Sequence, residues 1–217
     1  MINSWCILMQ KDVMNSQFEN FLFPGATTIG IKCVDGIVLA SENRLTFGRM
    51  ILSRSVKKIF KITDNIGLAC AGFASDFQKL QAIIRASINI FNLEENKKIN
   101  PKSAAKLVAN ILYKNKFFPY FTSTIIGGTD ENNRYLFALD PIGSIIEDEF
   151  AAIGSGSEIS IGLIEKKYKS NITTDKAKEL AIDSISAATK RDPTSGEGID
   201  ILVIKSDQIL DFHTNIK

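Results

Sequence analysis

The sequence predicts an α+β fold in which two β-sheets are stacked and helices cover the outer face of each. Three observations favour this class: strands and helices come in blocks, the helices fall in two pairs between runs of strands, and short turns join neighbouring strands. Parallel α/β sheets instead need strands and helices in alternation. The 217 residues contain no internal repeat and no low-complexity linker, so we expect residues 26–217 to form a single domain.

The first block of strands follows Pro24 and Gly25, which interrupt any preceding helix or strand. Two β-branched and apolar runs, residues 27–32 and 37–40, flank an Asp-Gly turn and predict a hairpin. Residues 42–49 are mostly polar and are expected to form a connection. Residues 50–56 then lead into a half-buried strand at 58–62, and a buried strand is expected at 66–72.

Two helices are expected next. Ser75 and Gln78 form a capping-box pattern, so we expect the first helix to begin near Ser75. Its apolar face recurs at helical spacing: Phe77, Leu80, Ile84, Ile88 and Phe91. The second helix starts at Asn100 and Pro101, an N-cap residue followed by proline at the first helical position, and Pro119 prevents its continuation.

The second half repeats this order of strands, helices and strands. Strands are expected at 123–127, 134–139, 144–149, 150–153, 199–205 and 208–213. A tight turn at Gly154–Ser157 precedes a helix at 158–168. A further helix, capped by Thr173 or Thr174, is expected to end near Arg191.

The composition excludes several classes of protein. The net charge of +2 does not point to nucleic acid or to an anionic membrane surface. Cys6, Cys33 and Cys70 are scattered and His213 is the single histidine, so we expect no zinc or redox motif, no metal and no cofactor. The apolar residues 5–9 are too few for a membrane span or a signal peptide. The cytoplasm is therefore the expected location.

The junction Gly25-Ala26-Thr27-Thr28-Ile29-Gly30, with the strand and Asp35-Gly36 turn that follow, resembles the start of proteasome β subunits. This resemblance implies the four-layer αββα sandwich of the N-terminal-nucleophile hydrolases. In that family the chain is cut after the glycine, and the exposed threonine attacks with its own α-amino group as base. Residues 1–25, which alone suggest a disordered tail, are then a propeptide-like segment.

The resemblance also implies the catalytic residues. Glu42 and Lys58 follow Ala26 by 16 and 32 residues, the family's spacing for an acidic residue and a lysine, although this pair alone would indicate only surface charge. Lys58 lowers the pKa of the nucleophile, and Glu42 orients Lys58. Two later segments, Gly154-Ser155-Gly156-Ser157 and Arg191-Asp192-Pro193-Thr194-Ser195-Gly196, supply Ser155, Asp192 and Ser195. The backbone N–H of Gly72 takes the position of the oxyanion hole.

A substrate pocket carries over by position in the same way. Its candidate residues are mostly apolar and uncharged: Leu45, Thr46, Val56, Phe60, Cys70, Ala74 and Gln78. Thr46 would hold peptide backbone by strand-like hydrogen bonds, and the rest would accept a hydrophobic side chain. The alternative for Val56, Phe60 and Cys70 is plain hydrophobic core.

Ala26 stands where the family has its nucleophilic threonine, and a methyl group cannot attack a carbonyl. We therefore expect both peptide hydrolysis and self-processing to be lost. Thr27 could replace it after cleavage between Ala26 and Thr27, but a shift of one residue along a strand turns the side chain to the other face. Ala26 has two conceivable origins, an engineered threonine-to-alanine change or a natural inactive paralogue. Residues 36–42 and 139–144 are similar to the archaeal β subunits that lack the nucleophile, which favours the natural origin.

Three functions follow from these alternatives. In the first, the chain is a structural subunit of an archaeal proteasome, assembled with α-type and other β subunits in stacked seven-membered rings. An ATP-dependent regulator on the α rings then delivers unfolded polypeptides. In the second, it is a threonine endopeptidase that uses Thr27, or threonine at position 26 in a parent form. In the third, it is another amidohydrolase of the same fold that acts on a small amide, which the two serine-containing segments disfavour.

Overall fold

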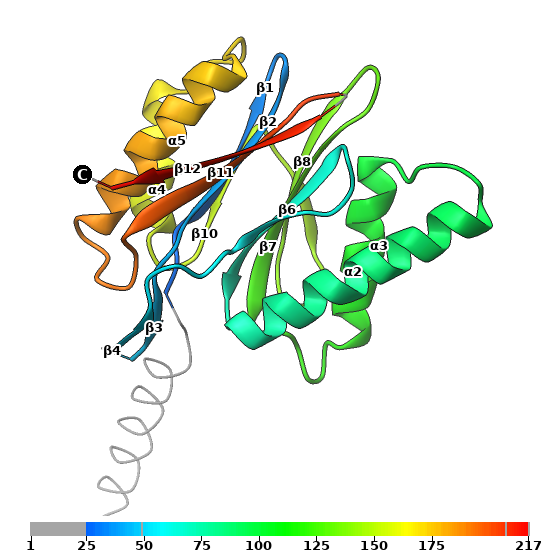
Figure 1. The fold of residues 1–217 in the computed structure, drawn as a ribbon, viewed down its shortest axis with the longest axis horizontal. Helices are drawn as coiled ribbons and strands as arrows, with labels where there is room; N and C mark the ends of the chain where they lie inside the picture. The colour runs from blue at the N-terminus through cyan, green and yellow to red at the C-terminus, as the bar shows by residue number, and fades with distance from the viewer. Residues whose placement is uncertain (1–24, 49, 207, 217) are drawn as a thin grey trace, which may run out of the picture.

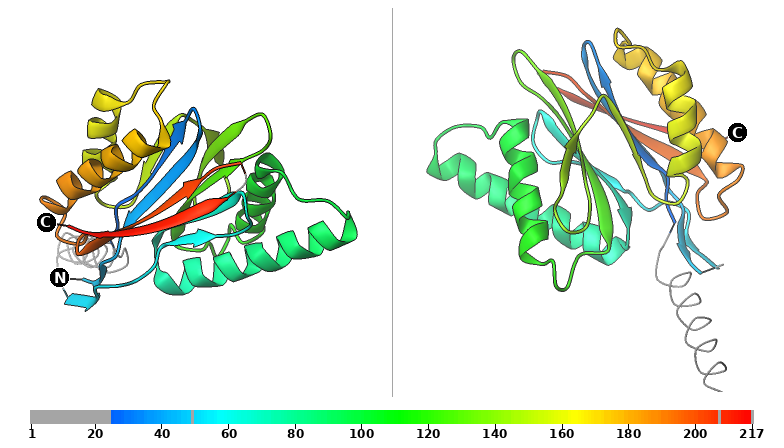
Figure 2. Two further views of the ribbon diagram at one scale, coloured as in Figure 1. Left: turned by 45° about the horizontal axis from the view of Figure 1, so that its top comes forward. Right: turned by 180° about the vertical axis from the view of Figure 1, so that it is seen from behind.

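A computed structural model describes residues 25–48, 50–206 and 208–216. Two antiparallel sheets are stacked face to face, and a pair of helices covers the outer face of each (Figure 1). The two further views show the same four layers (Figure 2). This arrangement confirms the predicted four-layer αββα sandwich. The predicted propeptide-like segment lies, up to Pro24, outside the described residues.

The first sheet contains the junction strand. Its order is β10-β1-β2-β11-β12. The strands are β1 (Thr28–Cys33), β2 (Gly36–Glu42), β10 (Phe150–Ile153), β11 (Gly198–Ile204) and β12 (Ile209–Asn215). β1 lies between β2 and β10, with Thr28 opposite both Ser41 and Ile153. Gly25, Ala26 and Thr27 thus enter the sheet between Glu42 and the turn that follows Ile153.

The second sheet has the order β5-β6-β7-β8-β9. Its strands are β5 (Ile59–Lys61), β6 (Ile66–Gly72), β7 (Thr122–Thr129), β8 (Arg134–Leu139) and β9 (Ile145–Glu147). β9 is shorter than the strand predicted at 144–149. Gly72 pairs with Thr122 at the end of the sheet that faces the junction.

The helices are α2 (Ala74–Glu94) and α3 (Pro101–Lys114) over the second sheet, and α4 (Ser157–Lys167) and α5 (Thr174–Thr189) over the first. α3 is capped as predicted, because the Asn100 side chain accepts a hydrogen bond of 2.7 Å from the Ser103 amide. The predicted capping box of α2 is wrong. The N-cap is Phe73, no described side chain caps it, and Ser75 lies within the first turn.

The start of α5 is also capped in a way that the sequence did not indicate. Thr173 is the N-cap residue, but none of the described residues receives a capping bond from its side chain. The Asp35 carboxylate, from the turn between β1 and β2, instead accepts from the amide and the hydroxyl of Thr174 at 2.8 and 2.7 Å. A carboxylate at a helix N-terminus also complements the helix dipole.

The hydrophobic core fills all three interfaces between the four layers. Ile37, Leu39 and Ile125 are among the residues buried between the sheets. Larger clusters lie between each sheet and its helices, as expected from the apolar faces of these helices. At Gly30 a Cβ atom would lie 2.7 Å from the Leu136 side chain, so any larger residue there would force side chains of the facing sheet to move.

The predicted connection at 42–49 is the largest error in the fold. It contains the short strand β3 (Leu45–Phe47), which pairs with β4 (Met50–Ser53) as a separate two-stranded hairpin. The register shifts between Leu45 and Thr46, and strands this short leave no alternating pattern to detect.

Among the described helices, none has the combined length and hydrophobicity that a bilayer crossing requires.

Candidate functional site

The site is built around Ala26, in the extended segment that leads into β1. Ala26 is 1% exposed, and its amide donates a hydrogen bond of 3.1 Å to the Ser155 hydroxyl. Its carbonyl accepts a bond of 3.2 Å from the Gly156 amide. The turn between β10 and α4 therefore holds both polar groups of the Ala26 backbone. The side chain at this position is only a methyl group.

Lys58 and Glu42 form a buried ion pair beside this segment, with 1% and 0% of their side chains exposed. The Lys58 ammonium donates to Glu42 Oε1 and, at 2.6 Å, to the Arg44 carbonyl. Glu42 Oε1 also accepts from the Thr27 amide at 3.4 Å, so one carboxylate oxygen links Lys58 to the Ala26–Thr27 peptide. The predicted pair is thus brought to the junction.

Burial disfavours the charged forms of both Lys58 and Glu42. It lowers the pKa of Lys58, and the negative charge of Glu42 opposes that shift. Burial likewise raises the pKa of Glu42, against the charge of Lys58 and the hydrogen bonds that the Gly196 and Arg44 amides donate. Each charge therefore depends on the other to remain ionised in the folded protein.

A second network joins Ser155, Asp192, Ser195 and Thr27. Asp192 Oδ2 accepts hydrogen bonds from Ser155 at 2.6 Å and from Ser195 at 2.7 Å. Because the Ser195 proton is used in this bond, the Thr27 hydroxyl must be the donor in its 2.7 Å bond to Ser195. Thr27 is 0% exposed, and its hydroxyl oxygen lies against Gly156. Its side chain thus belongs to the Asp192 network, whereas only its amide reaches Glu42.

Asp192 should make the stability of the fold sensitive to acid. Although burial opposes the shift, hydrogen bonds from Ser155, Thr194 and Ser195 lower the pKa of Asp192 below its ordinary value of 3.8. A lowered pKa in the folded state contributes stability that is present above the unfolded-state pKa and is lost as the pH falls through the folded-state pKa. We expect thermal midpoints measured between pH 6 and 2 to contain an acid-sensitive component that Asp192→Asn removes and Ser195→Ala reduces. Identical dependence of the thermal midpoint on pH in the unmodified chain, the Asp192→Asn variant and the Ser195→Ala variant would contradict this.

Gly72 ends β6 beside the junction, with φ at +138°, a conformation that favours glycine. It lines a pocket of about 220 Å³ together with Gly25, Thr122, Gly154 and Ser155. The position predicted for an oxyanion-binding amide is therefore adjacent to the peptide that precedes Ala26.

Replacing Gly72 by alanine is expected to destabilise the protein by at least about 1–3 kcal/mol, since it combines steric clash with backbone strain. The added Cβ would lie 2.1 Å from the Phe121 carbonyl oxygen. Gly162 within α4 is the matched control, because its Cβ would meet nothing within 4 Å. Gly162→Ala should stabilise the helix by about 0.5–1 kcal/mol. Urea unfolding of both variants measures the difference, and equal effects would show that Gly72 tolerates a side chain.

The predicted substrate-pocket residues separate into two groups. Cys70 is fully buried, and Val56, Phe60 and Ala74 pack against the same cluster between the second sheet and α2. Leu45 and Thr46 lie on β3, whereas Gln78 is exposed on α2. Burial raises the pKa of the Cys70 thiol and keeps it neutral. The first group is packed in the core beside Lys58, whose carbonyl accepts a hydrogen bond of 2.9 Å from the Cys70 amide, and this placement is compatible with both a pocket and a plain core.

Several residues of the site carried no signal in the sequence. The Arg44 carbonyl and the amides of Arg44 and Gly196 complete the hydrogen bonds of Lys58 and Glu42. Backbone groups such as these cannot be read from residue types. Asn43 donates to Asp200 at 2.7 Å and fixes the strand end between Glu42 and Arg44. Within the described part of the chain, no group of three side chains suited to holding a metal ion occurs.

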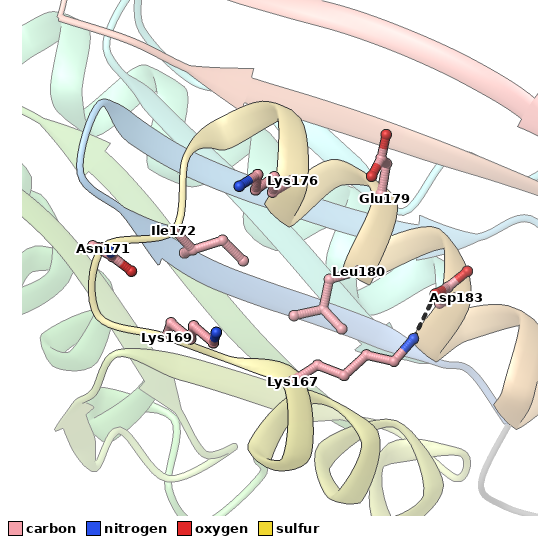
Figure 3. A pocket seen from close by; sticks show the side chains of 8 residues that line it. All are labelled: Lys167, Lys169, Asn171, Ile172, Lys176, Glu179, Leu180 and Asp183. Carbon is pink, nitrogen blue, oxygen red and sulfur yellow. Dashed lines mark hydrogen bonds and ion pairs between the residues drawn. The ribbon is translucent and has the colours of Figure 1, made fainter.

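A larger pocket lies far from the junction, between α4 and α5 (Figure 3). Its volume is about 480 Å³, and Lys167, Lys169 and Lys176 line it with Glu179 and Asp183. Lys167 is paired with Asp183 at 2.8 Å. The buried side-chain atoms that lack a partner among the described residues, on Asn43 and Thr124, lie elsewhere. The pocket therefore offers surface charge but no prepared catalytic group.

Known proteins are similar to this chain over most of its length. The family model described as "Proteasome subunit" matches residues 23–204. The chain is 48% identical over 198 residues to "Proteasome subunit beta 2" of Caldivirga maquilingensis, covering 91% of this chain and 98% of that protein. It is 44% identical to "Proteasome subunit beta 2" of Thermofilum pendens, covering 84% and 89%, and 42% identical to "Proteasome subunit beta 1" of Ignicoccus hospitalis, covering 83% and 91%.

Proposed function

Because this chain belongs to the proteasome subunit family, we propose that it is a β-type subunit of an archaeal core particle that completes the ring without cutting peptide bonds. Its partners are α-type subunits and other β subunits in stacked seven-membered rings. An ATP-dependent regulator delivers unfolded polypeptides through the α rings, and the particle works in the cytoplasm.

One observation carries the proposal of catalytic silence. Lys58, Glu42, Ser155 and Asp192 are arranged around position 26, which holds alanine. A threonine nucleophile needs a hydroxyl that a neighbouring base and cation can activate, and the Ala26 methyl offers neither a proton nor a lone pair. The retained polar residues then serve as a buried network that stabilises the fold, because removal of one partner leaves the other charge uncompensated.

The geometry also weighs against Thr27 as a replacement nucleophile. Its hydroxyl donates to Ser195 on the Asp192 side of the segment, and its amide, not its side chain, lies toward Glu42. Use of Thr27 would require the side chain to leave this buried bond after cleavage between Ala26 and Thr27. A one-residue shift of β1 would also turn every side chain of the strand to the opposite face.

The test is the intact mass and N-terminal sequence of the subunit after assembly with its α-type partner and any second β subunit, combined with a peptidase assay on hydrophobic fluorogenic peptides. A chain that starts near Met1, or at Ala26 after trimming by an active neighbour, together with no hydrolysis attributable to this subunit, supports the proposal. A chain that starts at Thr27 and hydrolyses peptides would overturn it in favour of the peptidase. Failure to enter any particle with α-type subunits would overturn the ring role itself.

A further inference from the structure

The last strand of the first sheet carries the single histidine of the chain, and two hydrogen bonds connect this histidine to the candidate site. His213 on β12 lies opposite Asp200 on β11, and its Nδ1 atom lies 2.8 Å from Asp200 Oδ1. The other oxygen of this carboxylate, Oδ2, accepts a hydrogen bond of 2.7 Å from the Asn43 side chain. Asn43 directly follows Glu42, where β2 ends (Figure 1). One carboxylate thus joins the edge strand to the strand end that bears the partner of Lys58.

Asn43 is fixed in the interior by its backbone. It is 4% exposed, and its amide donates hydrogen bonds to the carbonyls of Gly196 and Gly198 at 3.3 and 3.1 Å. Its own carbonyl accepts a hydrogen bond of 2.9 Å from the Val56 amide. Any displacement of Asn43 would therefore be transmitted to Glu42, the residue before it.

The side-chain amide of Asn43 can take only one orientation. Because an ionised carboxylate only accepts hydrogen bonds, the Nδ2 atom must be the one that faces Asp200. The Oδ1 atom is then buried, and none of the described residues donates a hydrogen bond to it. Asn43 Oδ1 and His213 Nε2 lie 2.8 and 3.0 Å from the point where a Cβ atom on Gly198 would stand, so the two atoms are close neighbours. A buried acceptor without a donor costs stability.

The protonation state of His213 decides whether a donor lies beside this acceptor. In the neutral ring whose Nδ1–H donates to Asp200, the Nε2 atom is itself an acceptor, so two acceptors lie near each other. In the imidazolium both ring nitrogens are donors. Protonation therefore supplies a donor next to Asn43 Oδ1 and places a positive charge beside the Asp200 carboxylate.

The groups that face the imidazole favour its charged form. His213 is 56% exposed and lines a pocket of about 780 Å³ with Asn43 and Asp200. The hydrogen bond to Asp200 raises the pKa of His213 above its ordinary value of 6.5, although burial opposes the shift. The Asn215 side chain and the charge of Asp211 contribute further to the rise. The other charged side chains that line this pocket are engaged in ion pairs: Lys57 with Asp211, and Arg54 with Glu197.

We propose that His213 and Asp200 form a proton-dependent clamp on Asn43. The charged imidazole holds the end of β2 in place, and with it the Glu42 carboxylate that pairs with Lys58. The clamp closes at mildly acid pH and loosens when the ring loses its proton, because the ion pair with Asp200 and the donor beside Asn43 Oδ1 disappear together. All of its groups belong to one chain, so the clamp acts independently of the proposed ring role.

Nitrogen-15 NMR of the full chain tests the titration, since the single histidine gives one pair of imidazole nitrogen signals. We expect a titration midpoint above 6.5 and, at high pH, the neutral tautomer that carries its proton on Nδ1. Asp200→Asn should lower the midpoint to about 6.5 or below. Asp211→Asn is the matched control, because it removes a carboxylate of the same strand that pairs with Lys57, and it should lower the midpoint less. A midpoint that Asp200→Asn leaves unchanged would overturn the proposal.

Amide hydrogen exchange tests the coupling to the site. The amides of Arg44 and Gly196 donate to Glu42 Oε2 at 2.6 and 3.0 Å, so their protection reports how firmly this carboxylate is held. Protection is measured at pH 5.5 and 8.5, each relative to an unstructured chain at the same pH. Because the folded-state pKa of His213 is raised, the contribution of the clamp is fully present below the unfolded-state pKa and is lost as the pH rises through the folded-state pKa. Protection of both amides should therefore fall about two- to fivefold between these pH values, the effect of an exposed ion pair.

Two variants and one internal reference make this measurement decisive. His213→Gln and Asp200→Asn should each abolish the difference between the two pH values. The amides of β8, in the second sheet, are the reference and should show no such difference in any of the three proteins. An equal pH dependence in the unmodified chain and in both variants would overturn the proposal, and so would an equal loss of protection in β8, which would indicate a change in global stability. Neither result bears on the ring role, which assembly with α-type subunits tests separately.

Discussion

Replacing Ala26 by threonine is expected to convert this chain into a self-processing peptidase. The surroundings that a threonine needs are already present: the Ser155 hydroxyl lies 3.1 Å from the nitrogen of residue 26, and Lys58 is held beside the segment by Glu42. After cleavage, that nitrogen becomes an α-amine able to take the proton of the new hydroxyl. Hydrolysis should rise on the order of 10³-fold or more over the Ala26 chain, since loss of a nucleophile costs covalent hydrolases at least this much.

The matched control is Ala26→Val, because valine has the shape of threonine but no hydroxyl. Both variants should enter particles with the α-type partner, and only the threonine variant should lose residues 1–25 and hydrolyse hydrophobic fluorogenic peptides. Ala26→Thr combined with Lys58→Met and Glu42→Gln, which leaves no unpaired buried charge, should assemble and remain inactive. If the threonine variant assembles but stays full-length and inactive, the site has lost more than its nucleophile, and the arrangement of Lys58, Ser155 and Gly72 does not suffice for catalysis.

The layered fold could be predicted because its helices and long strands carry strong local patterns. The predicted apolar face of α2 is buried from Phe77 to Ile88 and partly buried at Phe91, and Pro101 begins its helix after an Asn100 cap. The errors fall where local signals are weak or misleading. The three-residue strand β3 is too short to alternate. Ser75 fits a capping box, although the N-cap of α2 is Phe73, two residues earlier.

The candidate site could be predicted only as a set of positions, because its members come from segments far apart in the chain. Position by position, the resemblance indicated Glu42, Lys58, Ser155, Asp192 and Ser195, and the fold brings all five to the junction. The hydrogen bonds that complete the site come from backbone groups of Arg44 and Gly196 and from the side chain of Thr194, which no residue pattern marks. The order of the hydroxyl bonds, in which Thr27 donates to Ser195 and Ser195 donates to Asp192, likewise depends on the folded backbone.

The largest expected loss of stability comes from Lys58→Met. Glu42 would then keep its backbone donors but lose the cation that pairs with it in the described part of the chain, while remaining fully buried. Breaking a buried ion pair by removing one partner typically costs about 3–5 kcal/mol, because an uncompensated charge is left in the interior. Lys167→Met is the matched control, since the Lys167–Asp183 pair is half exposed and such pairs contribute about 0–1 kcal/mol. The free energy of unfolding in urea measures both.

The double variant Lys58→Met with Glu42→Gln should recover most of this loss, because no charge then remains buried. Measuring the Glu42→Gln single variant as well completes the double-mutant cycle and gives the coupling energy of the pair. The Lys58→Met protein should also gain stability, relative to the parent, when the pH is lowered from 8 to 5. Without its cation, the buried Glu42 carboxyl has a raised folded-state pKa, and the stability that protonation provides is lost as the pH rises through that value. A Lys58→Met loss no larger than that of Lys167→Met, with no change between these two pH values, would mean that the pair does not stabilise the fold. The retention of Lys58 and Glu42 beside an alanine would then need a reason other than stability.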